Sequence, residues 1–289
     1  VLRELGEDEE AVGVYRRALE VQPSFELQEK LDAILSGNKQ INVSNAALTG
    51  GSQKQKIIKQ VNVVARAGVK TSLQIIIPSF NRKQLLKRLL TQIDKEAESF
   101  DVSVDVFDDG SKEPVVESAS DYPNLAGLAV HRYNNHGKKQ YWQLVNHIFE
   151  YISKQNVDLF IYMPDDIEIC SGFFEKVVSQ WYAISDPQKI VLNLGLDNRT
   201  QCWTGFERIK CRFGETEVFK TQWVDMLMLF ERSFLEALDY CIQPISLSRW
   251  RKDPNLSSGV GQQISQRLHS LGFSLYQVSE YLISHGDHE

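Results

Sequence analysis

From residue 71 onward, short apolar runs alternate with longer stretches in which apolar residues recur every three to four positions. Apart from Gln74, the run LQIIIP is apolar, which is typical of a strand covered on both faces. The stretch that follows it keeps its leucines on one helical face. This rhythm predicts a doubly wound sheet with mostly parallel strands. The expected strands are 73–78, 101–107, 127–133, 157–164 and 189–195, and the expected helices are 81–97, 138–154 and 171–183.

The first 36 residues have a different, purely helical pattern. They resemble the second half of a tetratricopeptide repeat in the spacing of Gly6, Ala11, Tyr15, Ala18 and Pro23. A generic amphipathic helical hairpin is the alternative. Polar residues 37–70 predict a linker and lead-in. The chain opens within a helical pattern and without Met, so we expect it to be part of a longer protein.

Composition narrows the class of protein. Hydrophobic residues make up 42% and charged residues 24%, which is ordinary for a globular chain. No apolar run reaches the roughly 18 residues of a membrane span. The net charge of −6 argues against nucleic-acid binding but permits a small anion held through a metal. Four cysteines without CxxC spacing predict free thiols in a reducing compartment, here the cytoplasm.

Polar clusters follow four consecutive predicted strands. Because the carboxyl ends of parallel strands meet at one edge of a sheet, we expect these clusters to form one binding site. The clusters are Pro78–Arg82, Asp108–Ser111, Asn134–Lys139 and Pro164–Glu168.

Two of these clusters carry adjacent carboxylates. At the end of a strand, neighbouring side chains point in different directions. One of Asp165 and Asp166 is therefore expected to ligate Mg²⁺ or Mn²⁺, while the other holds a ligand hydroxyl or orients the loop. The alternative is a helix N-cap. The run Asp108–Ser111 is either a plain Asp-Gly turn or a carboxylate that accepts a base N–H or a ribose hydroxyl.

The ordered set IIIPSFNR, VDVFDDGS, an Asn-x-Gly loop and FIYMPDDIE resembles an inverting family-2 glycosyltransferase of the GT-A fold. The resemblance covers 71–289, with 71–194 as the nucleotide-sugar-binding half and 195–289 as the acceptor-side half. It implies an α/β, Rossmann-like fold whose mostly parallel sheet has helices on both faces, preceded here by the small α-helical repeat-like segment.

The resemblance also implies roles for individual residues. Asp109 matches the carboxylate that reads the base, usually uracil. Asp165 and Asp166 match the DXD-type motif, with Asp166 as ligand of Mn²⁺ or Mg²⁺ and Asp165 on the ribose or beside the ion. His285 is either a further ligand of the metal or diphosphate, or a structural residue. The other residues expected to bind the nucleotide sugar are Pro78, Ser79, Phe80, Arg82, Gly137, Lys138 and Lys139.

The chain departs from the family at its expected general base. Gln262 and Gln263 stand where the family usually has an acidic pair, and an amide cannot take the proton of an acceptor hydroxyl. Asp225 and Asp253 are the candidate bases. Asp225 interrupts an apolar run, so it is equally well explained as the buried partner of an arginine.

Together these features predict a metal-dependent glycosyltransferase of the hexosyl or N-acetylhexosaminyl type. The donor is expected to be a UDP-sugar and the acceptor a hydroxyl on a glycan, lipid-linked or protein substrate in bacterial-type glycan or glycoconjugate synthesis. The N-terminal helices are expected to bind a protein partner or to self-associate.

Two alternatives remain open. Gln262 and Gln263 favour a non-catalytic nucleotide- or glycan-binding scaffold with repeat-mediated protein interaction. A nucleotidyltransferase would need a glycine-rich phosphate loop after the first strand, which IIIPSFNR does not provide.

Overall fold

The computed structural model describes residues 70–196, 208–224, 226–251 and 253–285. All of them belong to the compact unit formed by Ala65–Asn198 and Glu207–Glu289. The predicted repeat-like helices of residues 1–36 and nearly all of the predicted linker lie outside the described residues, so both stay predictions.

Strands and helices alternate through the first part of this unit as the hydrophobic pattern predicts. Each of these predicted strands and helices is present, and no end differs from the prediction by more than two residues. In chain order the elements are β1 (Ser72–Ser79), α3 (Lys83–Glu96), η3 (Ala97–Ser99), β2 (Asp101–Asp108), η4 (Ala119–Asp121), β3 (Gly127–Arg132), α4 (Gly137–Ile152), β4 (Leu159–Tyr162), β5 (Ile167–Ile169), α5 (Phe173–Ala183) and β6 (Lys189–Asn193).

The second part adds shorter and more irregular elements. They are β7 (Ile209–Phe213), β8 (Thr216–Thr221), β9 (Met228–Phe230), α6 (Arg232–Ala237), η6 (Leu247–Trp250), α7 (Val260–Ser270), β10 (Ser274–Val278) and β11 (Ile283–His285).

Nine strands form one sheet in the order β3-β2-β1-β4-β9-β6-β10-β8-β7. The pairs from β3 to β4 are parallel, as is the pair of β6 and β10. Strand β9 lies antiparallel between β4 and β6, and β8 pairs antiparallel with β10 and β7. The predicted α/β sheet with mostly parallel strands is thus confirmed, and its antiparallel pairs all involve strands that follow residue 208.

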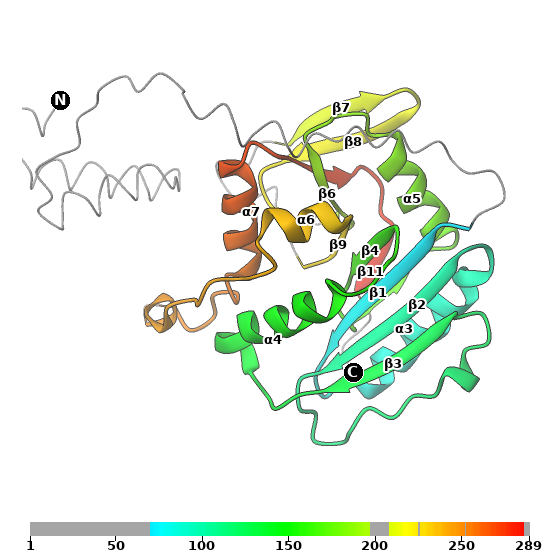
Figure 1. Ribbon diagram of the computed structural model, residues 1–289, viewed down its shortest axis with the longest axis vertical. Coiled ribbons are helices and arrows are strands. Elements are labelled where there is room, and N and C mark those ends of the chain that lie inside the picture. Colours follow the sequence, from blue (N-terminus) through cyan, green and yellow to red (C-terminus); the bar gives the residue numbers. More distant parts are fainter. Residues whose placement is uncertain (1–69, 197–207, 225, 252, 286–289) are drawn as a thin grey trace, which may run out of the picture. The chain divides into compact units, whose positions relative to one another are not determined.

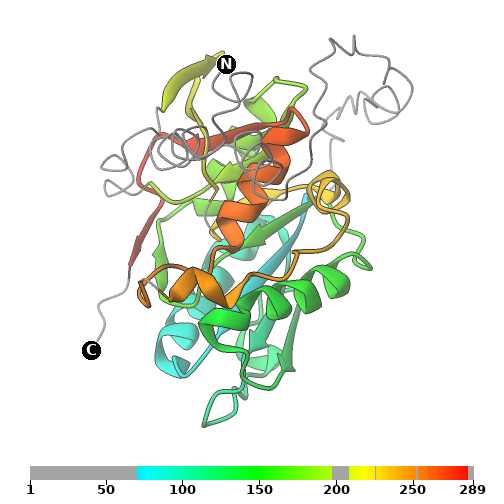
Figure 2. The same ribbon diagram turned by 90° about the vertical axis from the view of Figure 1, so that its left-hand side faces the viewer.

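Helices cover both faces of this sheet (Figures 1 and 2). Leu73, Ile75 and Ile77 of β1 pack into a core with α3 and α5, while Ile76 faces a second core with α4, α6 and α7. Because successive side chains of a strand point to opposite faces, both sets must be apolar. This accounts for the mostly apolar run of β1, in which the buried Gln74 is the exception and donates to Asp105.

The sequence analysis did not predict the hairpin of β7 and β8. Strand β7 alternates apolar and basic residues, and Gly214 at the turn has φ 58°. That alternation with a central glycine was the available signal. A second unpredicted pair joins β5 and β11 and sets His285 opposite Ile167.

None of the helices in the described ranges is long and apolar enough to cross a bilayer. Cys170, Cys211 and Cys241 are free thiols, in agreement with the prediction for these three residues.

The turn after β2 depends on a glycine. Gly110 has φ 77°, a conformation that glycine adopts without steric cost. A Cβ added at Gly110 would lie 2.7 Å from the backbone nitrogen of Asn135, in the loop that leads into α4. The loops after β2 and β3 therefore approach too closely for any other residue at this position.

Replacing this glycine tests the close approach. Gly214→Ala is the matched control, because Gly214 also has positive φ but a Cβ there meets no atom within 4 Å. The control should lose about 1 kcal/mol of unfolding free energy from backbone strain alone. Gly110→Ala should lose about 1–3 kcal/mol more, because its methyl overlaps backbone that cannot withdraw. Chemical denaturation measures both losses, and equal losses would show that the approach of Asn135 is not limiting.

Lys189 gives the fold a specific pH dependence. Its Nζ donates to the carbonyl of Trp181 at 2.5 Å and lies 4.1 Å from the centre of the Trp181 ring. Burial lowers the pKa of Lys189 to about 8, although Glu231 and Asp186 act in the opposite direction.

The unfolded chain therefore holds more protons than the folded one between about pH 8 and the ordinary lysine pKa, so stability from this residue rises with pH there. Between pH 7.5 and 9.5 the unfolding free energy of wild type should rise by roughly 1 kcal/mol from this residue, and Lys189→Met should lack this rise. Chemical denaturation at the two pH values measures it. The exposed Lys154→Met, which removes a surface ion pair with Glu150, should keep the rise. Parallel pH profiles for wild type and Lys189→Met would contradict the assignment.

Candidate functional site

A cavity of about 360 Å³ opens at the carboxyl ends of β1, β2 and β4, beside the first turns of α4. Its volume falls in the range of small-molecule sites, roughly 300–1,000 Å³. Every residue predicted to bind the nucleotide sugar lines it except Lys139. The lining residues are Pro78, Ser79, Phe80, Arg82, Asp109, Gly137, Lys138, Tyr141, Leu144, Pro164 and Asp165.

Tyr141 and Leu144 are the lining residues that the sequence analysis missed, whereas Pro164 belongs to one of the predicted polar clusters. Tyr141 lies one helical turn after Gly137, and Leu144 almost one turn further, so all three share one face of α4. The hydroxyls of Tyr141 and the fully buried Tyr162 are 2.6 Å apart, which ties this face to β4. The spacing from Gly137 was the signal that could have identified them.

The register of β1, β2 and β4 determines where the bottom of the cavity lies. Strands β1 and β2 end level, with Ser79 opposite Asp108, and the amide of Met163 just after β4 bonds to the carbonyl of Ile76. The loops that follow these strands therefore leave the sheet at the same edge. This is the arrangement expected for parallel strands.

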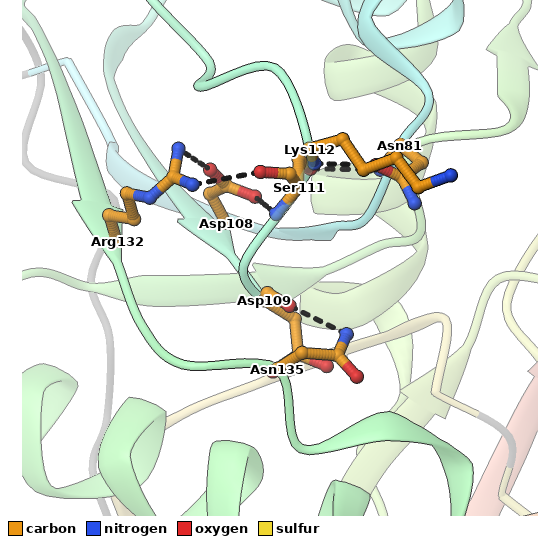
Figure 3. A network of polar contacts seen from close by, with 7 residues as sticks. All are labelled: Asn81, Asp108, Asp109, Ser111, Lys112, Arg132 and Asn135. Atoms are coloured by element: carbon orange, nitrogen blue, oxygen red, sulfur yellow. Dashed lines mark hydrogen bonds and ion pairs between the residues drawn. The ribbon is translucent and has the colours of Figure 1, made fainter.

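A network of side-chain bonds locks the loops after β1 and β2 together (Figure 3). Ser111 Oγ accepts from the amide of Asn81, and Asn81 Oδ1 accepts from the amide of Lys112, both at 2.8 Å. Asp108 accepts from the amide of Ser111 at 2.8 Å and from Arg132 at 3.3 Å. Asp108 therefore has the turn-stabilising role, since both of its oxygens are used inside the network.

Asp109 faces the cavity and also holds the start of α4. Its Oδ1 accepts from the amide and the Nδ1–H of His136 at 2.9 and 2.6 Å, and its Oδ2 accepts from the amide of Gly137 at 3.2 Å. Its main-chain oxygen accepts from Asn135 at 2.8 Å, a contact drawn in Figure 3. A carboxylate offers about four acceptor positions, so one further N–H can be accommodated. Sequence reasoning missed His136 as the partner of this carboxylate.

Asp165 and Asp166 follow β4, and Arg82 bridges them. Arg82 Nη1 is 3.1 Å from Asp165 Oδ1 and 2.8 Å from Asp166 Oδ2. Ser79 Oγ donates to Asp165 Oδ2 at 2.6 Å. Burial raises the pKa of Asp165, and the bonds from Ser79 and Arg82 oppose this only in part. A carboxylate in this position favours additional positive charge nearby.

The acidic pair has the donor set of an ion shared with a polyphosphate. Among the described residues no three acidic, histidine or cysteine side chains form a metal-binding group. Mg²⁺ in nucleotide enzymes, however, is commonly held by one or two carboxylates plus phosphate oxygens. Asp166 Oδ1 forms no hydrogen bond with a described residue. Ile167, the residue after Asp166, lies opposite His285 in the pair of β5 and β11. The residues present therefore fit a divalent ion that a ligand helps to hold.

The first turn of α4 concentrates positive charge. Lys138 and Lys139 lie at the N-terminal end of a 16-residue helix that has no acidic residue in its first turn. The helix dipole disfavours cations at this end, so two lysines there are unfavourable unless an anion is bound beside them. Lys138 lines the cavity, and its Nζ donates to the carbonyl of Pro254 at 3.1 Å.

Among the described residues considered for proton removal, Asp253, Gln262 and Gln263 do not line the cavity. Asp225 lies outside the described residues. Asp253 precedes Pro254 and accepts from the amide of Asn255 at 2.8 Å in a tight turn near Lys138. Gln262 accepts from Arg249 at 2.9 Å, and Gln263 bonds both backbone groups of Gln243. Both glutamines are thus engaged in contacts between α7 and the segment that precedes it.

Comparison with known proteins identifies the fold. No curated protein resembles the chain in sequence. Among solved structures, TarS 1–349 of S. aureus is 13% identical with a TM-score of 0.50, covering 75% of this chain and 60% of that one. A longer TarS structure gives 13% identity and a TM-score of 0.51, covering 75% and 37%.

The mannosyltransferase PcManGT of Pyrobaculum calidifontis, solved with GDP-Man and Mn²⁺, is 14% identical with a TM-score of 0.51, covering 74% of this chain and 56% of that one. The chain thus spans less than two thirds of each of these three structures. Residues 74–212 match the family model for glycosyl transferase family 2, and the unit that contains them has the GT-A fold.

Proposed function

We propose that this protein is a metal-dependent glycosyltransferase that moves a sugar from a nucleoside diphosphate sugar to an acceptor hydroxyl. One observation supports this most strongly. A single cavity is lined both by Asp165, one of an acidic pair suited to a divalent ion, and by Lys138 at the N-terminus of α4, which is suited to a diphosphate. A metal and a polyanion bound side by side are what a leaving nucleoside diphosphate requires.

UDP is the nucleotide we propose. Asp109 has one acceptor position left, which suits the single imide N–H of uracil, and Pro78 and Phe80 provide apolar surface for a flat base. Phe80 is 44% exposed, so it can stack on a base without rearrangement of the core. The structural neighbour PcManGT was solved with a guanine nucleotide, which makes GDP-sugars the donors to compare.

The residues of the cavity have distinct parts in the proposed reaction. Lys138 and the N-terminus of α4 stabilise the negative charge that develops on the leaving diphosphate. Ser79 orients Asp165, which would hold the ribose or lie beside the ion. Asp166 would ligate the ion, with His285 as a further candidate ligand. When bound, a divalent ion supplies Lewis-acid stabilisation of the diphosphate. Asp225 and Asp253 are the proposed general bases, and a base opposite the leaving group gives inversion at the anomeric carbon.

The remaining predictions carry over as parts of this proposal. The transferred sugar is a hexose or an N-acetylhexosamine, and the acceptor is a glycan, lipid-linked or protein hydroxyl in bacterial-type glycan or glycoconjugate synthesis. The protein acts in the cytoplasm, and its N-terminal helices bind a partner or a second copy.

One observation favours a second candidate, a non-catalytic nucleotide- or glycan-binding scaffold. Gln262 and Gln263 bond to Arg249 and Gln243, and neither provides a carboxylate that could take the proton of the acceptor hydroxyl. UDP binding without turnover of any UDP- or GDP-sugar would favour this candidate over the transferase.

Release of UDP from UDP-sugars in the presence of Mn²⁺ tests the proposal. Asp166→Asn preserves shape but removes the charge that the ion needs, so turnover should fall by about 10²–10³-fold. Glu168→Gln is the matched control, because Glu168 lies two residues away and pairs with Arg88 on the surface. The control should retain turnover within about twofold, as expected of an exposed ion pair. Equal turnover by Asp166→Asn and wild type would contradict the assigned metal site.

A further inference from the structure

One guanidinium nitrogen serves both carboxylates of the acidic pair. Arg82 Nη1 donates to Asp165 Oδ1 and to Asp166 Oδ2, so a single positive charge lies between two negative ones. The second oxygen of Asp165 is occupied by Ser79. The oxygens left for another cation are therefore Asp165 Oδ1 and the two oxygens of Asp166. Arg82 contacts one oxygen of each carboxylate.

The carboxylates are held more firmly than the arginine. The side chains of Asp165 and Asp166 are 3% and 14% exposed, whereas that of Arg82 is 43% exposed. The backbone before Arg82 is also fixed, because Asn81 has φ 56° and is bonded to Ser111 and Lys112. The base of the arginine is thus anchored at the start of α3 while its end can swing into solvent.

A divalent ion that uses both carboxylates competes with this guanidinium. Asp165 Oδ2 is bonded to Ser79, so such an ion has to take Asp165 Oδ1, which Arg82 Nη1 contacts at 3.1 Å. Mg²⁺ or a similar ion needs its oxygens at roughly 2.0–2.1 Å, and two cations that close together repel each other. An ion shared by the pair therefore displaces the arginine.

We infer that Arg82 is the built-in counter-cation of the metal-free site, which competes with a divalent ion for Asp165 and Asp166 and leaves them when the ion binds. Arg82 is then a positioning residue that keeps both carboxylates in place before the ion arrives. Its released guanidinium lines the same cavity and is available to the diphosphate. This last step rests on the proposed function, whereas the competition itself does not.

The chain offers a closely matched control. Arg88 lies on the same helix that Arg82 precedes, is 45% exposed, and pairs with Glu168 at 2.5 Å. Arg88→Met removes the same charge from the same neighbourhood without touching the acidic pair. A general electrostatic effect would appear in both variants, and competition would appear only in Arg82→Met.

Binding of Mn²⁺ to the protein without nucleotide, followed by electron paramagnetic resonance, tests the inference. Arg82→Met should bind Mn²⁺ about tenfold more tightly than wild type, a typical strength of coupling between two sites. Arg88→Met should bind as wild type does, and Arg82→Lys should fall between the two, since one ammonium bridges the pair less well. Equal or weaker Mn²⁺ binding by Arg82→Met, or no binding by any of the proteins, would overturn the inference.

Thermal unfolding provides a second readout that does not depend on activity. In EDTA, Arg82→Met should unfold about 2–4 °C below wild type, because Asp165 is left buried beside another uncompensated carboxylate. Mn²⁺ should restore that loss, whereas it should change Arg88→Met no more than wild type. A loss that Mn²⁺ does not restore would mean that Arg82 has only a structural role.

The two proposals fail in different ways. Tighter Mn²⁺ binding by Arg82→Met together with no UDP release from any donor would support the counter-cation and reject the transferase. Mn²⁺-dependent UDP release by wild type together with unchanged Mn²⁺ binding by Arg82→Met would support the transferase and reject the counter-cation.

Discussion

Two adjacent carboxylates at the end of a fully buried strand set the main electrostatic constraint on this protein. Strand β4 carries only apolar residues and Tyr162, so Asp165 and Asp166 emerge side by side from a region that offers them little solvation. Negative charges that are both close and desolvated need cations nearby. Arg82 and the lysine-bearing start of α4 meet that need around one cavity, which is why the cavity suits an ion together with a polyanion.

The walls of this cavity are held in place by other acidic residues. Asp108 closes the turn after β2, and Asp109 fixes the first residues of α4 through His136 and Gly137. These bonds set the positions of the loops before any ligand binds. Such preorganisation is what allows charged groups at a site to stabilise developing charge without first having to rearrange.

The two parts of the unit differ in how closely the sequence predicts them. Strands β1 to β4 are parallel and end in the expected order of loops. The later part adds antiparallel strands, and its glutamines at 262 and 263 are bonded to Arg249 and Gln243. Under the proposed function, a carboxylate other than this pair has to take the acceptor proton. Donor binding and acceptor activation can therefore be tested separately.

The sequence by itself determined the alternating elements and the edge where the polar loops gather, because side-chain periodicity and the direction of parallel strands are local properties. It also identified most of the residues that line the cavity. Only the tertiary structure decided how Arg82 bridges Asp165 and Asp166, that His136 holds Asp109, and that β9 runs antiparallel. The bridging partners come from segments 27 to 84 residues apart, and such pairings depend on strand order, which no local pattern encodes.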